Sequence, residues 1–476
     1  MVSVTAEWNS ALVVVAVVVV SLVSLWRWRR NKFNFFKERG IPGPEPSLIS
    51  GNFFQLWNRD TIKVLDEWSN KYGDIYGMFN GDAPFLMVKD LELLRRVFIK
   101  DFAMFVDRGD VWALMNARPE QRNSVSFAKS DRWKFIRRFI SMAFTSAKLR
   151  PMVASMNKSV DNCLDLLETR CREAPDGQAN AYPLLGCLAF ELVAETACGL
   201  YLDVQNKPND QYFSSAKTYV LNVVESFYQR AGQFLTGVRS LVALTCVLER
   251  HFGDEPLVAL CHKAEPIVAF REKDPSLARP DMLQSLLEAK VPEELLVRSE
   301  FRERTNDEGE FLMPVKAIAC NAASILTAGF ETVSANSSSC VFCLARYLEI
   351  QEKVRQEVNA AYEKHGGFTY DAISDLPYTT QVIFETLRLY SPVVAFSPEQ
   401  KASRDPLAFQ PYGIGPRNCV GMKLAQLEMT LIVAKLVHRF RLRLGSKHEN
   451  GELKMHTHSI IASPKNGVWL TVEKIR

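Results

Sequence analysis

The segment that decides the fold is Tyr412-Gly413-Ile414-Gly415-Pro416-Arg417-Asn418-Cys419-Val420-Gly421, followed directly by MKLAQLEMTLIVAKLVHRF. Its glycines allow a tight loop whose backbone lies close to a flat ligand. Cys419 stands at the start of a predicted helix over Val420–Arg441, where unpaired N–H groups and the helix dipole favour a thiolate. An anionic sulfur on such a loop is what axial ligation of haem iron requires. Most cysteines are inert buried side chains, so this argument alone leaves the ligand role open.

The whole loop resembles the signature of the cytochrome P-450 superfamily, which is an aromatic residue followed by x-x-G-x-R-x-C-x-G. Tyr412 supplies the aromatic residue, and Ala425 and Glu428 agree with the family downstream. The resemblance implies that Cys419 is the axial thiolate ligand of haem iron. It also implies that Arg417 faces a haem propionate, because a guanidinium binds a carboxylate through two hydrogen bonds. By the same resemblance, the loop glycines that bind the cofactor are Gly413 and Gly421.

A second segment, Ala328-Gly329-Phe330-Glu331-Thr332, lies in a long apolar stretch over Pro314–Glu349 that predicts a helix through the core. A helical threonine commonly donates back to the preceding turn, so this segment alone indicates little. The superfamily's oxygen-binding helix carries A/G-G-x-D/E-T, which matches throughout. The resemblance implies that Ala328 and Gly329 lie at the haem, with Gly329 leaving room for dioxygen. It also implies catalytic roles for Thr332, which offers a hydroxyl, and Glu331, which feeds protons along a relay.

Two residue pairs support the same resemblance. Glu385 and Arg388 are three apart on one helix face, and an isolated pair of this kind is usually a surface ion pair worth about 0.3–0.5 kcal/mol. In the superfamily the pair is buried and locks the cysteine loop from behind. Trp133 and Arg137 are four apart and resemble the helix whose Trp and Arg bind a propionate. Alone, they would indicate an amphipathic helix with an aromatic core residue.

The family pattern fails between Arg388 and Cys419, where thirty residues, 389–418, are fewer than the family uses. Residues 391–396 resemble the strand after the ExxR helix, whereas 397–400 resemble a later part of the fold. The resemblance therefore implies a deletion between about 396 and 397, arising from a skipped exon or a gene-model artefact. A strand hairpin, a short helix, a propionate-binding arginine and part of the substrate-pocket wall would be missing. Gln400 stands where a third, arginine member of the Glu385–Arg388 network belongs, and it cannot supply a charged fork.

The amino terminus carries an apolar run from Ala11 to Trp26, followed at once by a basic cluster. Sixteen residues at 1.5 Å per residue reach roughly 24 Å, and Trp8 extends the run toward the thickness of a bilayer core. The preceding residues contain Glu7 and no Lys or Arg, unlike a cleaved signal peptide. The pattern predicts a single-pass anchor with a lumenal amino terminus and a cytosolic body. A buried core helix is the alternative.

The chain divides into an anchor with its basic stop over residues 1–38, a proline-rich hinge over 39–47 and one domain over 48–476. The fold class predicted for the domain is mainly α with a small β region. Strands are expected at Ile75–Phe79 and Pro84–Val88 around Asn80-Gly81, and at Val468–Val472 after Asn466-Gly467. The poorly patterned segment from Val204 to Pro275 is interpreted as helices over a substrate entrance. Further helices are predicted at Ser130–Phe144, Val153–Thr169, Leu184–Cys198, Asp281–Ala289, Ile350–Lys364 and Thr379–Tyr390.

The composition fits this interpretation. The chain has 476 residues, of which 47% are hydrophobic and 24% charged, so collagen-like and disordered classes are excluded. A net charge of +4 without a long basic run argues against nucleic acid as a partner. The ten cysteines are irregularly spaced, which indicates reduced thiols in a cytosol-facing protein. Cys340-Val341-Phe342-Cys343 has no second pair, so a zinc site has little support.

From residue 40 to 476, the stretches GIPGP, KYGDIYGMFNGDAPFLMVKD, MAFTSAKLRPMV, GPRNC and PKNGVWLTV resemble the animal microsomal clan that contains the family 3 enzymes and thromboxane synthase. This resemblance implies a haem monooxygenase in the endoplasmic reticulum membrane. It would oxidise a lipophilic xenobiotic, steroid or lipid with O2 and electrons from NADPH–cytochrome reductase, with cytochrome b5 as a further partner. A cationic face for docking the reductase is expected at Arg132, Lys134, Arg138, Lys423 and Arg439. Two alternatives stay open: a thromboxane-synthase-like isomerase, and a variant impaired by the missing segment.

Overall fold

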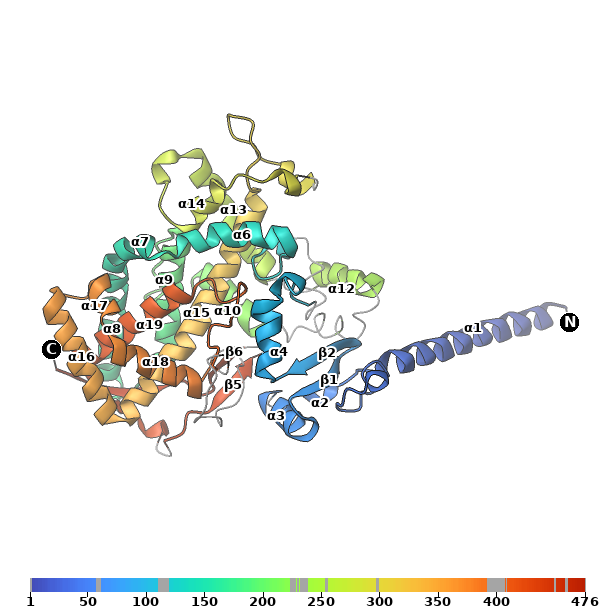
Figure 1. Ribbon diagram of the computed structural model, residues 1–476, viewed down its shortest axis with the longest axis horizontal. Coiled ribbons are helices and arrows are strands. Elements are labelled where there is room, and N and C mark those ends of the chain that lie inside the picture. Colours follow the sequence, from blue (N-terminus) through green and yellow to red (C-terminus); the bar gives the residue numbers. More distant parts are fainter. Residues whose placement is uncertain are drawn as a thin grey trace.

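The computed structural model describes residues 2–56, 61–109, 120–222, 228, 231, 239–252, 256–296, 299–391, 407, 409–448, 451–458 and 461–475. Over these residues the body is mainly helical with small sheets, as predicted (Figure 1). Helix α15 (Val315–Arg346) runs through its middle. It packs against α9 (Ala181–Cys198), α13 (Pro256–Lys273) and α19 (Met422–Arg439), so three helices far apart in the sequence meet on it.

Helices α15 and α9 are buried nearly all round because both lie in the core. The length and hydropathy of α9 would suit a membrane span, but 83% of it is buried inside the protein, so it is a core helix. The predicted stretch Pro314–Glu349 is not one helix. Helix α15 ends before Tyr347, whose backbone (φ −108°, ψ 79°) is not helical, and α16 (Leu348–His365) starts directly after it.

The remaining helices include those predicted at Ser130–Phe144, Val153–Thr169, Asp281–Ala289 and Thr379–Tyr390, several that were not predicted, and, between 204 and 275, α10, α12 and the whole of α13. They are α2 (Phe53–Leu56), α3 (Thr61–Tyr72), α4 (Leu91–Arg95), α6 (Ser130–Ala143), α7 (Ser146–Leu149), α8 (Val153–Glu173), α10 (Gln211–Asn222), α12 (Arg239–Phe252), α14 (Met282–Leu287), α17 (Tyr370–Ser374) and α18 (Pro377–Leu389).

The predicted first hairpin is present as β1 (Ile75–Asn80) and β2 (Ala83–Val88), which are antiparallel. Asn80 pairs with Ala83, so Gly81 and Asp82 form the turn, and the φ of 62° at Gly81 explains the glycine. The other described strands are β3 (Ala179–Asn180), β4 (Phe440–Leu444), β5 (Met455–His458), β6 (Ile461–Pro464) and β7 (Trp469–Lys474).

The strand expected after the second Asn-Gly turn is present as β7. Strand β7 does not return on β6 but lies between β3 and β4, while β5 and β6 form a separate hairpin. Asn180 explains the change of sheet, because its Oδ1 accepts a hydrogen bond from Val468 N at 3.0 Å. The side chain of Asn180 also lies where a Cβ at Gly467 would stand, 2.2 Å away. The turn at 466–467 therefore carries the chain from one sheet to the other.

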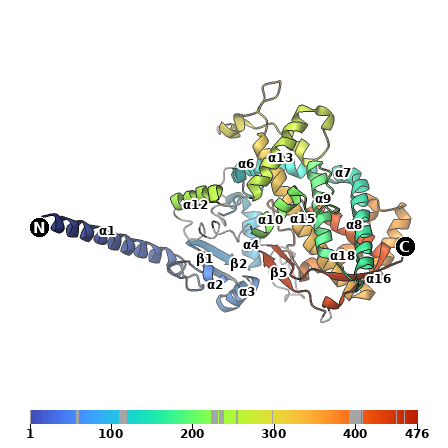
Figure 2. The same cartoon turned by 180° about the vertical axis from the view of Figure 1, so that it is seen from behind.

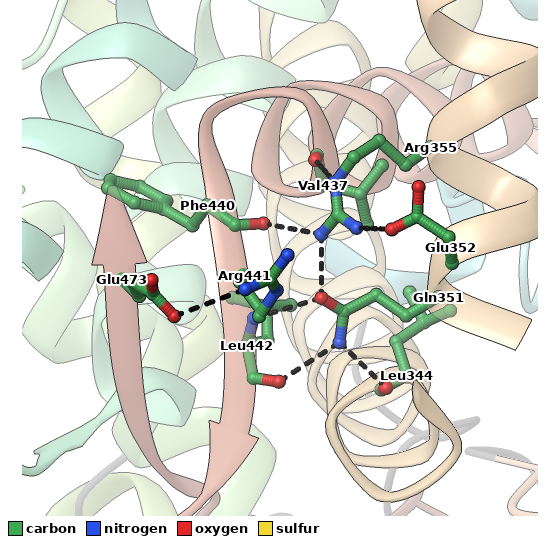
Figure 3. Close-up of polar contacts among 9 residues, drawn as sticks. All are labelled: Leu344, Gln351, Glu352, Arg355, Val437, Phe440, Arg441, Leu442 and Glu473. Carbon is green, nitrogen blue, oxygen red and sulfur yellow. Dashed lines mark hydrogen bonds and ion pairs between the residues drawn. The ribbon is translucent and has the colours of Figure 1, made fainter. Parts of the chain in front are cut away.

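A buried arginine fastens α16 to the end of α19 (Figure 3). Arg355 donates from Nε to Val437 O at 2.8 Å and from Nη2 to Phe440 O at 3.0 Å. Gln351 holds Arg355 and also bonds both backbone polar groups of Leu442. The last carbonyls of a helix have no partner within the helix. Arg355 satisfies two carbonyls at this helix end from outside and so fixes α19, the helix that follows the cysteine loop.

Helix α1 (Val2–Phe33) projects from the body as a rod, and both views show it clear of the other elements along most of its length (Figure 1, Figure 2). Its apolar side chains are accordingly exposed, for example Val20 at 64% and Leu22 at 60%. The proline-rich segment that follows is non-helical and lies against β1, where Gly77 N donates to Pro42 O at 2.8 Å.

Candidate functional site

The cysteine loop closes on itself through backbone hydrogen bonds. Cys419 N donates to Tyr412 O at 2.7 Å, and Asn418 N donates to Gly415 O at 3.0 Å. Gly413 and Gly415 have φ of 69° and 70°, a region that favours glycine. A Cβ on Gly415 would also lie 2.0 Å from Phe98 O. The glycines are therefore required by the shape of the loop and by its close approach to residues 96–100.

Helix α6 holds the residue before the cysteine. Arg137 donates from Nη1 to Asn418 O and from Nη2 to Asn418 Oδ1, both at 2.7 Å. This use of Arg137 differs from the expected one, in which its guanidinium binds a propionate. Two of its N–H groups instead set the position of Asn418, and through it the position of Cys419.

Arg417 is held by aromatic and backbone contacts and keeps one donor unused. Its guanidinium carbon lies 3.9 Å from the centre of the Trp133 ring. Nε donates to Val106 O and Nη2 donates to Ala128 O, both at 3.0 Å. Nη1 is buried and finds no hydrogen-bond partner among the residues that the structure describes. Burial and the nearby Arg108 lower the pKa of Arg417 to about 10, although Asp107 opposes this shift.

Arg108 belongs to the same cluster and was missed by the sequence analysis. Its Nη2 lies 3.4 Å from Arg417 O, and both Arg108 and Arg137 act electrostatically on the sulfur of Cys419. Three guanidinium groups thus gather at one loop, while Asp107 lies 3.9 Å from Arg417. Such a cluster with a buried unused N–H requires an anion. A haem propionate meets that requirement, so the residues present fit the cofactor. No sequence pattern marked Arg108.

The thiol of Cys419 is accessible on one side and enclosed by protein on the others. Enclosure raises the pKa of the Cys419 thiol, and the Gly421 N–H, Arg137 and Arg108 only partly oppose this effect. The Gly421 N–H at the helix start does favour the thiolate, as expected. In the protein chain without a bound metal, however, the effect of burial on the pKa of Cys419 is larger. An iron ion supplies the positive charge that a cysteine ligand needs to stay deprotonated.

The segment expected to bind oxygen, residues 328–332, lies on the one accessible face of the otherwise buried central part of α15, within its described residues. Ala328 is exposed and Thr332 is half-buried four residues later, so they share a face. Thr332 Oγ1 donates to Ala328 O at 2.8 Å, the ordinary back-bond of a helical threonine. Gly329 differs from its expected role, because a Cβ there would lie 2.5 Å from Val193 Cγ2. Its missing side chain makes room for α9.

Glu331 points away from Thr332. It is 8% exposed and accepts a hydrogen bond from the hydroxyl of Tyr182, at the start of α9. Burial raises the pKa of Glu331, and the Tyr182 hydrogen bond and Lys217 oppose the shift. The carboxyl group is therefore placed for a proton store behind α15, bonded to Tyr182, while the hydroxyl of Thr332 bonds Ala328 O. Tyr182 lies 149 residues away in the sequence and was not predicted.

Glu385 and Arg388 do form the predicted ion pair on α18, with two hydrogen bonds of 2.6 Å. The side chain of Glu385 is 50% exposed, however, and that of Arg388 is 11% exposed. The pair is thus half-open rather than buried behind the cysteine loop as expected. Gln400 and the junction near 396–397 lie outside the described residues.

The predicted cationic docking face is only partly available. Arg132 is 6% exposed and donates to Asn123 Oδ1, so its place in this face is wrong. Arg439 is occupied by Asp165 and Glu168, each at 2.6 Å. Lys134 pairs with Asp131 at 3.0 Å. Arg138 and Lys423 are exposed and remain candidates.

Comparisons with known proteins agree with this site. The family model described as Cytochrome P450 matches residues 41–395 and 394–471. Cytochrome P450 3A31 of Mesocricetus auratus is 26% identical, with 89% of each chain covered. Cytochrome P450 6B2 of Helicoverpa armigera is 26% identical over 96% of this chain and 97% of its own. Cytochrome P450 3A5 of Homo sapiens is 25% identical over 95% of each. The chain therefore belongs to the cytochrome P450 family, whose members are oxidoreductases that hold haem through a cysteine thiolate.

Proposed function

We propose that this protein is a membrane-anchored haem monooxygenase that oxidises a lipophilic small molecule with O2. Electrons would come from NADPH–cytochrome reductase, with cytochrome b5 as a further partner. The observation that carries the proposal is the cysteine loop with its arginine cluster, in which Arg417 Nη1 is buried without a partner among the described residues. A propionate supplies that partner, and the accessible Cys419 supplies the iron ligand.

The chain's own residues divide the work between binding and proton supply. Arg417 and Arg108 hold the propionates, Trp133 keeps the Arg417 guanidinium in place, and Arg137 positions the ligand through Asn418. When bound, haem activates dioxygen, and the cysteine thiolate supplies electron density that assists O–O cleavage. Thr332 keeps its hydroxyl oxygen on the accessible face of α15, where that oxygen can accept a hydrogen bond. Glu331 and Tyr182 hold a proton behind that helix.

Helix α1 supports anchoring in the endoplasmic reticulum membrane, with the catalytic body on the cytosolic side. Its apolar side chains face outward rather than into the body. A helix of 32 residues is long enough for a bilayer, which needs about 20 apolar residues. Basic residues follow the apolar run, and positive charge is retained on the cytosolic side.

The test is the spectrum of the reduced carbon monoxide complex. The purified full chain is expected to show the absorption band of thiolate-bound haem, and Cys419→Ser is expected to abolish it. Cys343→Ser is a suitable control, since Cys343 is a half-buried cysteine on α15. An unchanged spectrum in Cys419→Ser would overturn the assignment.

A second candidate is a catalytically impaired variant that lacks the segment near 396–397. Two observations favour it. The family match comes in two parts that overlap at residues 394–395, close to the deletion expected between about 396 and 397. Glu385 is also half-exposed, although its counterpart in the family is buried. The molar ratio of haem to protein separates the two candidates. A ratio near one supports the active enzyme; a low ratio that rises when the missing segment is restored supports the impaired variant.

A further inference from the structure

Large apolar side chains are exposed around the carboxyl end of α1. Ile49 is 75% exposed and Phe54 is 56% exposed, and the others are exposed by at least 37%. They continue the exposed apolar surface of α1 onto the body, and an exposed group of this kind marks an interaction site. We name this set the collar; its members are Trp26, Trp28, Phe35, Leu48, Ile49 and Phe54.

Arg29 ties the collar loop to α1. Although it belongs to the basic cluster, it is only 6% exposed. Its Nη2 donates to Ile49 O at 2.8 Å, and its Nε donates to Leu48 O. The Arg29 side chain is therefore hydrogen-bonded inside the protein and does not contact lipid head groups. It fixes the loop that presents Leu48 and Ile49 beside the end of the anchor.

A second contact joins α1 to the β1–β2 hairpin. Lys32 Nζ lies 2.9 Å from Asp82 Oδ2, at the turn of the hairpin. The side chain of Asp82 has no exposed surface, whereas that of Lys32 is 26% exposed. A buried carboxylate is strongly dependent on its cation. The pair therefore holds the end of α1 against the hairpin turn.

Aromatic packing and close glycine contacts complete the junction. The ring of Phe79, on β1, lies 4.9 Å from that of Phe33 and 5.3 Å from that of Phe36. A Cβ on Gly77 would stand 2.2 Å from the Phe36 ring, and one on Gly43 would stand 1.9 Å from Gly77 O. The segment expected to act as a hinge is thus packed onto β1 at van der Waals distance. A free linker has no such packing.

We propose that these contacts lock α1 and the β1–β2 hairpin into one rigid unit, and that this unit seats the collar in the interfacial layer of a lipid bilayer. This inference rests on the membrane anchoring proposed above. It adds that the anchor fixes the tilt and height of the catalytic body, instead of tethering it loosely.

The bilayer is the occupant that the collar fits because the collar continues the membrane-spanning surface. Trp26 and Trp28 end the apolar run of α1, at the depth where tryptophan is enriched in membranes. Both carry a cation on the ring: Arg30 lies 5.3 Å from Trp26 and Lys32 lies 5.0 Å from Trp28. The Arg30–Trp26 pair combines an apolar body with a charge for the head groups, whereas the charge of Lys32 is paired with Asp82. The Arg29 hydrogen bonds place Ile49 at the same level of the helix.

The first experiment measures depth. An environment-sensitive fluorescent amino acid is placed at position 49 of the full chain, bound to vesicles of phosphatidylcholine and phosphatidylserine. The matched control carries it at position 363 on α16, an exposed site at the end of the body away from α1 (Figure 1). The expected result is quenching by nitroxide lipids at position 49 and by aqueous iodide at position 363. Iodide quenching at both positions in vesicle-bound protein would contradict insertion of the collar into the bilayer, but it would not contradict anchoring by α1. Failure of the full chain to bind vesicles would overturn the anchor itself.

The second experiment tests the lock by tryptic cleavage at the exposed Lys37 and Arg39 in vesicle-bound protein. Asp82→Asn removes the carboxylate that pairs with Lys32 and that acts electrostatically on the buried Arg29. Because a buried cation that loses its counter-charge is strongly destabilised, this substitution is expected to speed cleavage about tenfold or more. The control is Asp66→Asn, which removes a loose pair with Lys89 at 3.8 Å on the same side of the fold. Equal rates in all three proteins would contradict the lock.

If Asp82→Asn fails to fold, hydrogen exchange of the wild-type chain tests the rigid unit instead. The amides of Gly40 and Ile41 donate to Lys37 O at 3.1 Å and Phe36 O at 3.0 Å, so they are expected to be protected. Their exchange at the rate of an unstructured linker would overturn the rigid unit.

Discussion

At the scale of single residues, the site depends on polar groups that are buried and only partly satisfied. Arg417 keeps a buried N–H without a partner among the described residues, and Glu331 keeps a buried carboxyl group with one strong partner, Tyr182. Both arrangements cost stability unless something at the site compensates. Such costs are usually retained where they serve binding or proton transfer.

The Tyr182–Glu331 contact gives the first prediction. Tyr182→Phe removes the hydroxyl that donates to the buried Glu331, so the free energy of unfolding should fall by about 1–3 kcal/mol. Tyr201→Phe is the control, because Tyr201 is 67% exposed. Urea unfolding of the two variants and the wild type measures the difference. Equal loss in both variants would show that the hydroxyl of Tyr182 has no special role.

The second prediction concerns Arg417. Arg417→Lys keeps the positive charge but loses the planar fork that bonds Val106 O, Ala128 O and the Trp133 ring. The haem content per protein should fall several-fold, while circular dichroism should show unchanged helix content. The same substitution at Arg138, which is exposed and directly follows Arg137 on α6, should leave haem content unchanged. Full haem loading in Arg417→Lys would remove this arginine from the propionate site.

At the scale of elements, helix α19 is placed by contacts at both ends. The cysteine loop precedes its start, and Arg355 and Gln351 of α16 hold its other end (Figure 3). A helix held at both ends keeps its position, and so does the cysteine loop before it. The stability of the fold and the position of Cys419 therefore both depend on the buried side chain of Arg355.

The third prediction tests this junction. Arg355→Met leaves the carbonyl groups of Val437 and Phe440 without their donor. The free energy of unfolding should therefore fall by about 1–3 kcal/mol for each of these buried acceptors. The control is Arg441→Met. Arg441 is 45% exposed and lies 3.6 Å from Glu473, so its loss should cost about 0–1 kcal/mol. Denaturant unfolding separates the two variants, and similar losses would mean that water replaces the guanidinium of Arg355.

The fourth prediction uses the buried face of α19. Glu428 is 1% exposed, its Oε1 has no hydrogen-bond partner within the described ranges, and burial raises its pKa well above 4.5. The folded chain then holds a proton that the unfolded chain releases above its ordinary pKa. Stability should therefore fall as pH rises from 5 toward 8, by at most about 1.4 kcal/mol per pH unit.

Glu428→Gln cannot titrate, so its stability advantage over the wild type should grow with pH across this range. Glu473→Gln serves as the control, since Glu473 is 59% exposed. Chemical unfolding at several pH values is the measurement. Parallel stability curves for the wild type and Glu428→Gln would show that Glu428 is ionised in the folded protein.

At the scale of the whole molecule, the local sequence pattern predicted helices and strands. Contacts between distant segments determine what the individual site residues bind. The helix ranges and the first hairpin followed from periodicity and the Asn-Gly turn, and the loop around Cys419 followed from its glycines and its resemblance to a family. Spacing placed Glu385 and Arg388 in one ion pair, because that contact is made within a single helix.

Contacts between distant segments were not predictable in this way. The partner of Glu331 lies 149 residues away, and the carbonyl that Arg108 approaches lies 309 residues away. Gly329 was assigned by motif, but its neighbour Val193 is on another helix. The same limit applies to the neighbours of β7, which were not predicted because they depend on contacts with distant residues such as Asn180.

The place of β7 has a consequence for synthesis of the chain. Val468 bonds Asn180 across 288 residues, and β7 lies between β3, which leads into core helix α9, and β4, which follows α19. After Asn180, the ribosome must therefore synthesise a further 288 residues before this sheet closes, at about 5–20 residues per second. The interior around α9 has to wait in an unfinished state during that time. The sheet that β7 completes is therefore among the last parts of the described fold to form.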